Sequence, residues 1–284
     1  MTRVVIHQDD VGMCHGANVA FLELFHIGAV TSGSVMVPCP WFPEIAEAAA
    51  DDPTLDLGVH LTLNAEKQHY RWRPLTAPAV GAGLVDADGY QWRDVSSVRE
   101  HADPVAVEAE LHAQVEQALA AGIDVTHLDA HMGAALAPEF AAAYLRLGVE
   151  YRLPVLLTGT LAGFGPNNHL VGADEATYGE FVAAARQAGQ PVFDVVLETP
   201  WDRRGAAEPA YEALFDSAPD GLVFLALHPN APGELEAIEP ESAHIRTEEY
   251  ELLRDGFLRG WCEGRDDVEL VGMRALRDAY RAAA

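Results

Sequence analysis

The sequence predicts a single-domain α/β protein built as a TIM-like barrel, and three observations lead to this expectation. Short apolar runs of strand length recur along the 284 residues, amphipathic segments of helical length separate them, and no repeat or low-complexity linker divides the chain. Seven or eight such units favour closure into a barrel, although a doubly wound open sheet has the same local signature. We therefore expect one barrel domain over residues 1–284.

The expected strands are apolar runs, because buried parallel strands are nearly continuous stretches of aliphatic residues. They cover residues 4–6, 34–37, 55–60, 125–129, 155–157, 192–197, 222–227 and 268–271. Apolar residues repeat with helical spacing between them, in segments 17–27, 42–50, 105–121, 138–147, 176–188, 207–215 and 248–263. This alternation of strand and helix indicates a parallel sheet.

One long interval interrupts the alternation after the third expected strand. Residues 62–104 lack strong periodicity and contain Tyr70, Trp72, Tyr90 and Trp92 among scattered prolines and glycines. Long irregular insertions in compact domains usually have a function, so we predict an insertion or lid loop here. A hydrophobic flap packed on the barrel rim would explain the same aromatic residues equally well.

The charge of the chain excludes several classes of partner. Asp and Glu number 44 against 18 Lys and Arg, which gives a formal net charge of −26 at pH 7. Such a chain has no basic surface for a phosphate backbone, and an anionic membrane would repel it. Neither nucleic acid nor a membrane is therefore expected as a partner, and the 49% apolar content excludes disorder.

Two further features indicate a cytoplasmic protein. No apolar run reaches 18 residues, and the apolar run near the N-terminus is too short for the core of a signal peptide. Cys14, Cys39 and Cys262 form no zinc-binding spacing and no CxxC pair. We expect these cysteines to be reduced and mostly buried.

Polar residues suited to catalysis or metal binding occur at the ends of several expected strands. Because parallel α/β folds carry their chemistry at the C-terminal ends of the strands, we expect these residues to converge. Arginine at a strand edge is more often a surface or ion-pair residue, and a lone histidine in an apolar strand is more often a hydrogen-bonded core residue. The candidates are Asp9, Asp10, His60, His127, Asp129, His131, Arg152 and His228.

Two groups among these candidates have a composition typical of metal sites. Asp9 and Asp10 repel each other unless a cation or proton offsets them, and adjacent side chains on an extended chain point apart. The alternative for this pair is a solvated turn with an Asp helix cap. His127, Asp129 and His131 share one face of a strand, which suits two imidazole ligands, one ligand oriented by a carboxylate, or a hydrogen-bonded polar strand end.

One carboxylate and two imidazoles with an open position for water form a ligand set found in hydrolytic metal sites. By ligand type, such a set suits Zn, Co, Ni or Fe better than Mg. The carboxylate left over, Asp9, is a candidate general base, and the histidine left over, His228, is a candidate general acid.

Five motifs in order resemble those of the YdjC/ChbG-like carbohydrate deacetylases, a family related to the polysaccharide deacetylases. HQDDVG at residues 7–12 resembles the ADDFG signature, and VTSGSVM at 30–36 resembles a VTSTSLM-like second strand. GVHLTL at 58–63, THLDAH at 126–131 and LHP at 227–229 resemble the GxHxxL, THxDxH and CHP-like motifs. The resemblance implies a distorted TIM-like barrel and a metal-dependent hydrolase that removes an acetyl group from an N-acetylated sugar or oligosaccharide.

The resemblance also implies roles for the candidate residues. Asp10, His60 and His131 would hold one divalent metal, either Zn or Mg. Asp9 would be the general base, His228 the general acid, and Arg152 would orient Asp9. The remaining two candidates, which would support the ligands or contact the substrate, are His127 and Asp129.

The chain departs from the family pattern at several positions. Gln8 stands where the family usually has Ala, and Val11 replaces Phe. The family usually continues after the THxDxH motif with further histidines, whereas this chain has Met132, Gly133 and Ala134. Substrate contacts near this strand are therefore expected to differ from those of the family.

Two other functions fit the same residues. A sugar isomerase or lyase would also use a metal and a base on such a barrel, but Lys67 is the only lysine and lies in the insertion, which counts against Schiff-base chemistry. A non-catalytic carbohydrate-binding protein with a vestigial site is the third alternative. All three imply a small-molecule carbohydrate as the partner, and a homodimer is the default expectation for such enzymes.

Overall fold

The computed structural model describes residues 1–77, 81–165 and 172–283. Within them, seven strands form one sheet in the order β4-β3-β2-β1-β6-β5, and β7 pairs with the first residues of β1. Every pairing between these strands is parallel, as predicted. The strands are β1 (Thr2–Val11), β2 (Ser32–Val35), β3 (Leu57–Leu61), β4 (Leu128–Ala130), β5 (Val195–Glu198), β6 (Gly221–Leu227) and β7 (Val268–Leu270).

An irregular segment connects the two edges of the curled sheet. The amide of Leu156 donates to Leu128 O at 2.8 Å, on β4, and the amide of Phe193 donates to Leu157 O at 2.9 Å, shortly before β5. The apolar run 155–157, expected to be a strand, thus makes only isolated bridges. The fold is a distorted TIM-like barrel. The strand expected at residues 155–157, between β4 and β5, is reduced to this irregular segment.

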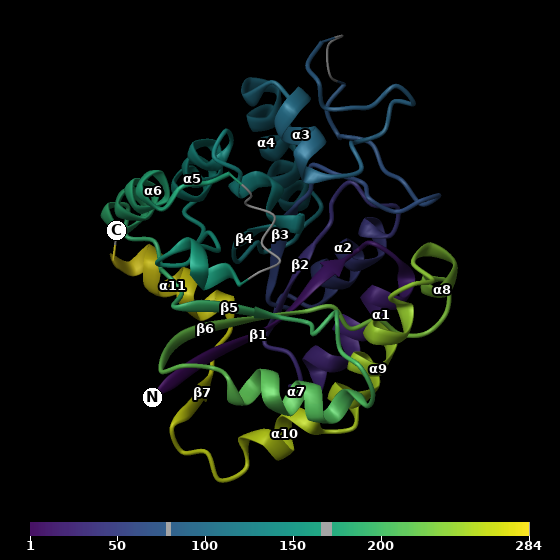
Figure 1. Cartoon of the computed structure of the whole chain (residues 1–284), viewed down its shortest axis with the longest axis vertical. Coiled ribbons are helices and arrows are strands. Elements are labelled where there is room, and N and C mark those ends of the chain that lie inside the picture. Colours follow the sequence, from purple (N-terminus) through teal and green to yellow (C-terminus); the bar gives the residue numbers. More distant parts are fainter. Residues whose placement is uncertain (78–80, 166–171, 284) are drawn as a thin grey trace.

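Helices flank the sheet in Figure 1, where α5, α6 and α11 lie together on one side and α7, α9 and α10 on another. Two short 3-10 helices, η1 (His131–Leu136) and η2 (Leu161–Phe164), follow β4 and the irregular segment. The α-helices are α1 (His15–His26), α2 (Phe42–Asp51), α3 (Val95–His101), α4 (Pro104–Ala120), α5 (Ala141–Glu150), α6 (Glu175–Gln187), α7 (Ala207–Asp216), α8 (Leu235–Ile238), α9 (Ala243–Arg254), α10 (Phe257–Cys262) and α11 (Met273–Ala283).

The helices differ from the expected ones mainly in the C-terminal third. The segment 248–263 was expected to be one helix, but α9 ends at Arg254 and α10 begins at Phe257. Gly256 between them has a φ of 98°, which a right-handed helix does not allow. The helices α3, α8 and α11 were not expected from the sequence.

Among the described residues, no helix has both the length and the apolar character needed to cross a membrane.

The aromatic residues of the insertion attach it to the barrel. Trp72 is buried in one apolar cluster with Met13 and Met36, which lie outside the insertion. The Tyr70 hydroxyl donates to Met13 O, just after β1, at 2.6 Å. These contacts agree with the alternative of a flap packed on the rim, while the lid function of residues 62–104 stays a prediction; residues 78–80 lie outside the described residues.

Candidate functional site

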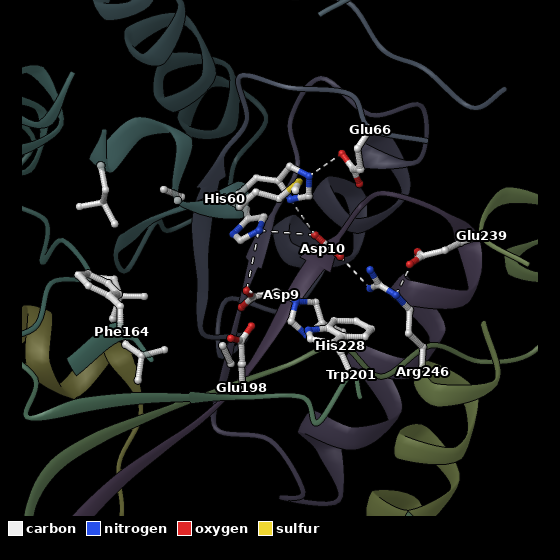
Figure 2. Close-up of a pocket in the computed structure, with 18 of the residues that line it drawn as sticks. Asp9, Asp10, His60, Glu66, Phe164, Glu198, Trp201, His228, Glu239 and Arg246 are labelled. Atoms are coloured by element: carbon white, nitrogen blue, oxygen red, sulfur yellow. Dashed lines mark hydrogen bonds and ion pairs between the residues drawn. The ribbon is translucent and has the colours of Figure 1, made fainter. Parts of the chain in front are cut away.

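A pocket of about 440 Å³ collects five of the eight candidate residues at the C-terminal ends of the strands (Figure 2). Asp9 and Asp10 come from the end of β1, His60 from β3, His131 from the residue after β4, and His228 from the residue after β6. The convergence expected for parallel strands thus occurs for these five residues. It results from strands far apart in sequence ending at the same rim.

A backbone irregularity brings both aspartates into this pocket. Asp10 has a φ of 61°, a left-handed conformation that costs a residue other than glycine about 1–3 kcal/mol. The pairing of β1 with β2 also shifts register between Gln8 and Val11. Adjacent side chains on a regular strand would point apart, but this kink lets Asp9 and Asp10 line the same cavity.

Asp10, His60 and His131 lie close enough to share one cation. Asp10 Oδ1 is 3.2 Å from His131 Nδ1 and 3.5 Å from His60 Nε2, and one ligand atom from each residue lies within 4.8 Å of the others. Asp10 Oδ1 is buried and makes no hydrogen bond with the described residues. A buried carboxylate oxygen without a hydrogen bond is costly unless a positive charge lies beside it, so this donor set fits a divalent cation.

Both imidazoles have their second ring nitrogen held by a carboxylate. His60 Nδ1 lies 3.0 Å from Asp129 Oδ1, and His131 Nε2 lies 3.0 Å from Glu66 Oε2. A carboxylate accepts a hydrogen bond from the N–H beside it, so in the neutral form of each ring the nitrogen facing Asp10 keeps its lone pair. Asp129 thus orients His60, an imidazole of the neighbouring strand β3, rather than one of the histidines of its own motif.

The carboxylates around His131 favour a positive charge on its ring. Burial alone would lower the pKa of His131, but Glu66 and Asp10 outweigh it and raise the pKa to about 10. Burial raises the pKa of Asp10, yet the Arg246 guanidinium and His131 hold it well below its usual range. A bound metal would replace the proton on His131.

Asp9 stands between the cation site and His228. Its Oδ1 is 2.7 Å from His7 Nδ1, and its Oδ2 is 3.7 Å from His228 Nε2 and 3.9 Å from His60 Nε2. His127 lies below the pocket, where its Nε2 is 2.9 Å from His7 Nε2. Burial lowers the pKa of His127 to about 3, so this ring is neutral and supports His7.

A closed ring of ion pairs links the site to the insertion and to the α8–α9 segment. The contacts range from 2.6 Å, between Lys67 Nζ and Glu239 Oε2, to 3.2 Å, between Arg246 Nε and Glu239 Oε2. Arg246 Nη1 also donates to Asp10 Oδ2 at 2.7 Å. In order, the ring consists of Asp10, His131, Glu66, Lys67, Glu239 and Arg246.

The structure does not bring Arg152 to the pocket. This residue follows α5 and precedes the irregular segment, so it lies at the start of that segment rather than at its C-terminal end. Its guanidinium donates to Arg281 O at 2.7 Å, on α11. The prediction that Arg152 orients Asp9 disagrees with this position. The guanidinium beside the aspartate pair belongs to Arg246 and contacts Asp10 instead.

Several residues of the site were missed by the reasoning from sequence. Glu66 lies in the aperiodic insertion, while Arg246 and Glu249 lie on a helix whose polar residues resemble those of any solvated face. Arg246 and Glu249 are buried, and the Glu66 side chain is 20% exposed. The only local signal was the isolation of Lys67 as the single lysine, and it gave no indication of partners.

Comparison with known proteins agrees with the resemblance in the motifs. The carbohydrate deacetylase of Thermus thermophilus is 41% identical over 162 residues, which are 57% of this chain and 56% of that protein. The chain thus matches little more than half of that relative's length. The carbohydrate deacetylase of Brevibacillus brevis is 30% identical over 207 residues, covering 68% of this chain and 79% of that protein.

A solved structure shares the fold over almost the whole chain. A protein of Enterococcus faecalis V583, described as a putative cellobiose-phosphate cleavage protein, superposes with a TM-score of 0.77 and 22% identity, over 97% of this chain and 98% of that one. The sequence model of the YdjC-like proteins matches residues 3–264. Because that match spans nearly the whole chain, this protein belongs to the YdjC-like family.

Proposed function

We propose that this protein is a metal-dependent hydrolase that removes the acetyl group from an N-acetylated sugar or oligosaccharide. The observation that carries the proposal is the buried trio of Asp10, His60 and His131 with Asp9 and His228 beside it. The names of the Thermus and Brevibacillus relatives, both carbohydrate deacetylases, point in the same direction.

The donor set of the trio would hold the metal through one carboxylate oxygen and two imidazole nitrogens. A divalent cation bound there would lower the pKa of a water molecule and polarise the acetyl carbonyl. Arg246 keeps Asp10 Oδ2 occupied at 2.7 Å, so Oδ1 is the oxygen turned toward the imidazoles. Imidazole nitrogens favour Zn²⁺ over Mg²⁺ as the metal, although a carboxylate ligand accepts both.

Asp9 would act as the general base and His228 as the general acid. His7 holds one oxygen of Asp9, so the other oxygen faces the space between His60 and His228 and can accept the proton of the attacking water. Burial lowers the pKa of His228 to about 4, so this ring is neutral near pH 7. Its Nε2 faces the same space, so it can take up the proton that Asp9 has accepted and give it to the amine as the C–N bond breaks.

The remaining walls of the pocket suit a sugar that carries an acetyl group. Phe164 lies across the cavity from the aspartates in Figure 2. Trp201 packs on the His228 ring with centroids 4.7 Å apart and also lines the cavity. An indole in this position offers a flat face on which a sugar ring can stack. Leu136, Leu156 and Val196 also line the cavity.

Acetate release tests the proposal directly. The protein is expected to release acetate from N-acetylglucosamine oligosaccharides, to lose this activity after treatment with a chelator, and to regain it with Zn²⁺ or Mg²⁺. Asp10→Ala is expected to lose both metal binding and acetate release. The absence of acetate release from a panel of N-acetylated sugars, or activity that survives Asp10→Ala, would overturn the proposal.

A further inference from the structure

A string of buried hydrogen bonds lies behind His228, on the side of its ring that faces away from the pocket. His228 Nδ1 is 2.8 Å from Thr199 Oγ1, and Thr199 Oγ1 is 3.0 Å from Glu249 Oε1. Thr199 follows β5 and Glu249 lies on α9, and both are at most 1% exposed. Neither residue lines the pocket, so any effect on the reaction must pass through His228.

The donors around Glu249 determine the direction of this string. The Tyr211 hydroxyl donates to Glu249 Oε1 at 2.7 Å, and the backbone amide of His228 donates to Oε2 at 2.6 Å. Together with Thr199, three donors surround a carboxylate that in its ionised form only accepts. Burial raises the pKa of Glu249 to about 7, so the ionised form predominates above that pH.

The single proton of the Thr199 hydroxyl is therefore directed to Glu249. Its oxygen can then only accept a hydrogen bond from the imidazole, which requires the proton of neutral His228 to sit on Nδ1. In that tautomer, Nε2 presents its lone pair to the pocket, where Asp9 Oδ2 lies 3.7 Å away. Nε2 is thus the nitrogen able to take up a proton and release it.

We propose that Thr199 and Glu249 are positioning residues that hold His228 in the Nδ1–H tautomer, so that Nε2 serves as the acid. The inference rests on the proposed deacetylase function. Asp9 first passes the proton that it takes from the attacking water to Nε2, which lies 3.7 Å from its Oδ2. As the bond between the acetyl carbon and nitrogen breaks, the departing nitrogen keeps the electron pair and takes that proton from Nε2. The imidazolium becomes neutral imidazole and retains the proton on Nδ1, with its ring still held by Thr199.

The tautomer itself can be observed without any substrate. In protein labelled with ¹⁵N-histidine, the nitrogen shifts report which ring nitrogen carries the proton, and the spectrum of His228→Gln assigns the His228 signals. Above pH 7 we expect His228 to be Nδ1–H in the wild type and in Thr199→Ser. In Thr199→Val, which cannot accept this hydrogen bond, the Nε2–H form should appear. Unchanged His228 shifts in Thr199→Val would overturn the inference.

Kinetics separate a positioning role from a merely structural one. For an N-acetylated sugar, Thr199→Val and Glu249→Gln are expected to lower kcat by about tenfold or more, with KM little changed, and Thr199→Ser to restore it. For 4-nitrophenyl acetate, whose phenolate leaves without an acid, the same variants should keep nearly full activity. An equal loss on both substrates would overturn the inference.

A matched control is available in Thr158, another fully buried threonine of the barrel. Its hydroxyl donates to Thr160 O at 2.7 Å, outside the pocket. Thr158→Val removes the same atom at a similar depth and should leave both activities and the His228 shifts unchanged. A loss with Thr158→Val equal to that with Thr199→Val would count against the proposal. Failure of the wild type to release acetate would instead overturn the proposed function.

Discussion

Asp10 combines a strained backbone with two carboxylate oxygens in different surroundings. One oxygen is held by Arg246 at 2.7 Å, while the other faces His60 and His131 without a hydrogen bond among the described residues. Unfavourable backbone conformations of this kind persist where the surrounding structure holds them, and they cluster at functional sites. At this residue, strain and an open buried charge thus coincide at the position expected to bind a cation.

Glu249 gives a prediction about stability at the scale of one residue. Burial raises its pKa from near 4.5 to about 7. A carboxyl whose pKa is raised by folding stabilises the folded protein below its unfolded pKa, and this stabilisation is lost as the pH rises through the folded value. The free energy of unfolding of the wild type relative to Glu249→Gln should therefore fall between about pH 4.5 and 7, by as much as about 3 kcal/mol.

Denaturant unfolding of metal-free wild type and Glu249→Gln across this pH range measures the effect. Comparing the two proteins at each pH removes the contributions of all other titrating groups that they share. A difference that stays constant with pH, or that grows as the pH rises, would contradict the prediction.

At the scale of elements, the ring of ion pairs fastens the insertion to the rest of the site. Lys67 is 9% exposed and lies between Glu66, at 3.1 Å, and Glu239, at 2.6 Å. Glu66 in turn holds His131. The insertion therefore contributes charge to the site itself, in addition to the aromatic contacts that attach it to the rim.

Lys67→Met should destabilise this connection, because it leaves Glu66 and Glu239 close together without their shared cation. Breaking a buried ion pair by removing one partner costs roughly 3 kcal/mol or more, whereas an exposed pair contributes at most about 1 kcal/mol. Unfolding by urea is the measurement, and limited proteolysis should cut residues 62–104 faster in this variant.

The exposed pair of Arg146 and Glu108 provides the control. Arg146 lies 2.8 Å from Glu108, and its side chain is 59% exposed. Arg146→Met should change the free energy of unfolding by no more than about 1 kcal/mol. If Lys67→Met lowered the free energy of unfolding no more than Arg146→Met, the ring of ion pairs would not hold the insertion to the rest of the site.

At the scale of the whole molecule, the acidic character of the chain extends into the pocket. Five carboxylates line it, whereas its two cationic side chains, Lys67 and Arg246, each contact two of these carboxylates. No arginine or lysine of the described lining is thus free to bind a phosphate group. The carboxylates are those of Asp9, Asp10, Glu66, Glu198 and Glu239.

We therefore expect a neutral N-acetylated sugar to be a better substrate than its phosphate ester. A net charge of −26 together with the acidic lining opposes entry of a second anion. The value of kcat/KM should be about tenfold or more lower for the phosphate ester at low ionic strength, and salt should narrow the difference because it screens the repulsion.

Paired assays of one N-acetylated sugar and its 6-phosphate, at low and at high salt, check this expectation. The activity on the neutral sugar serves as the control, since it should depend little on salt. A phosphate ester that is hydrolysed as fast as the neutral sugar, or a difference that does not respond to salt, would contradict it.

Most of the architecture could be predicted because it depends on local patterns. The continuous aliphatic run at 222–227 predicted a buried strand, which is β6. The helical spacing of apolar residues at 105–121 predicted a helix, which is α4. Two features were not predicted. The apolar run 155–157 forms no regular strand, and α9 and α10 are separate helices. A short apolar run does not show whether it will pair regularly with the strands on either side of it. The break at Gly256 depends on the direction in which the chain turns there.

By itself, the sequence determined the fold class, the acidic charge and the polar strand ends that meet in the pocket. Parallel strands bring their C-terminal ends to one rim, so order along the chain suffices to place Asp10, His60 and His131 together. Only the tertiary structure decided the partners of these residues. Arg246 and Glu249 come from a helix more than 200 residues after β1, and a buried charge differs from a solvated one only through the residues packed around it.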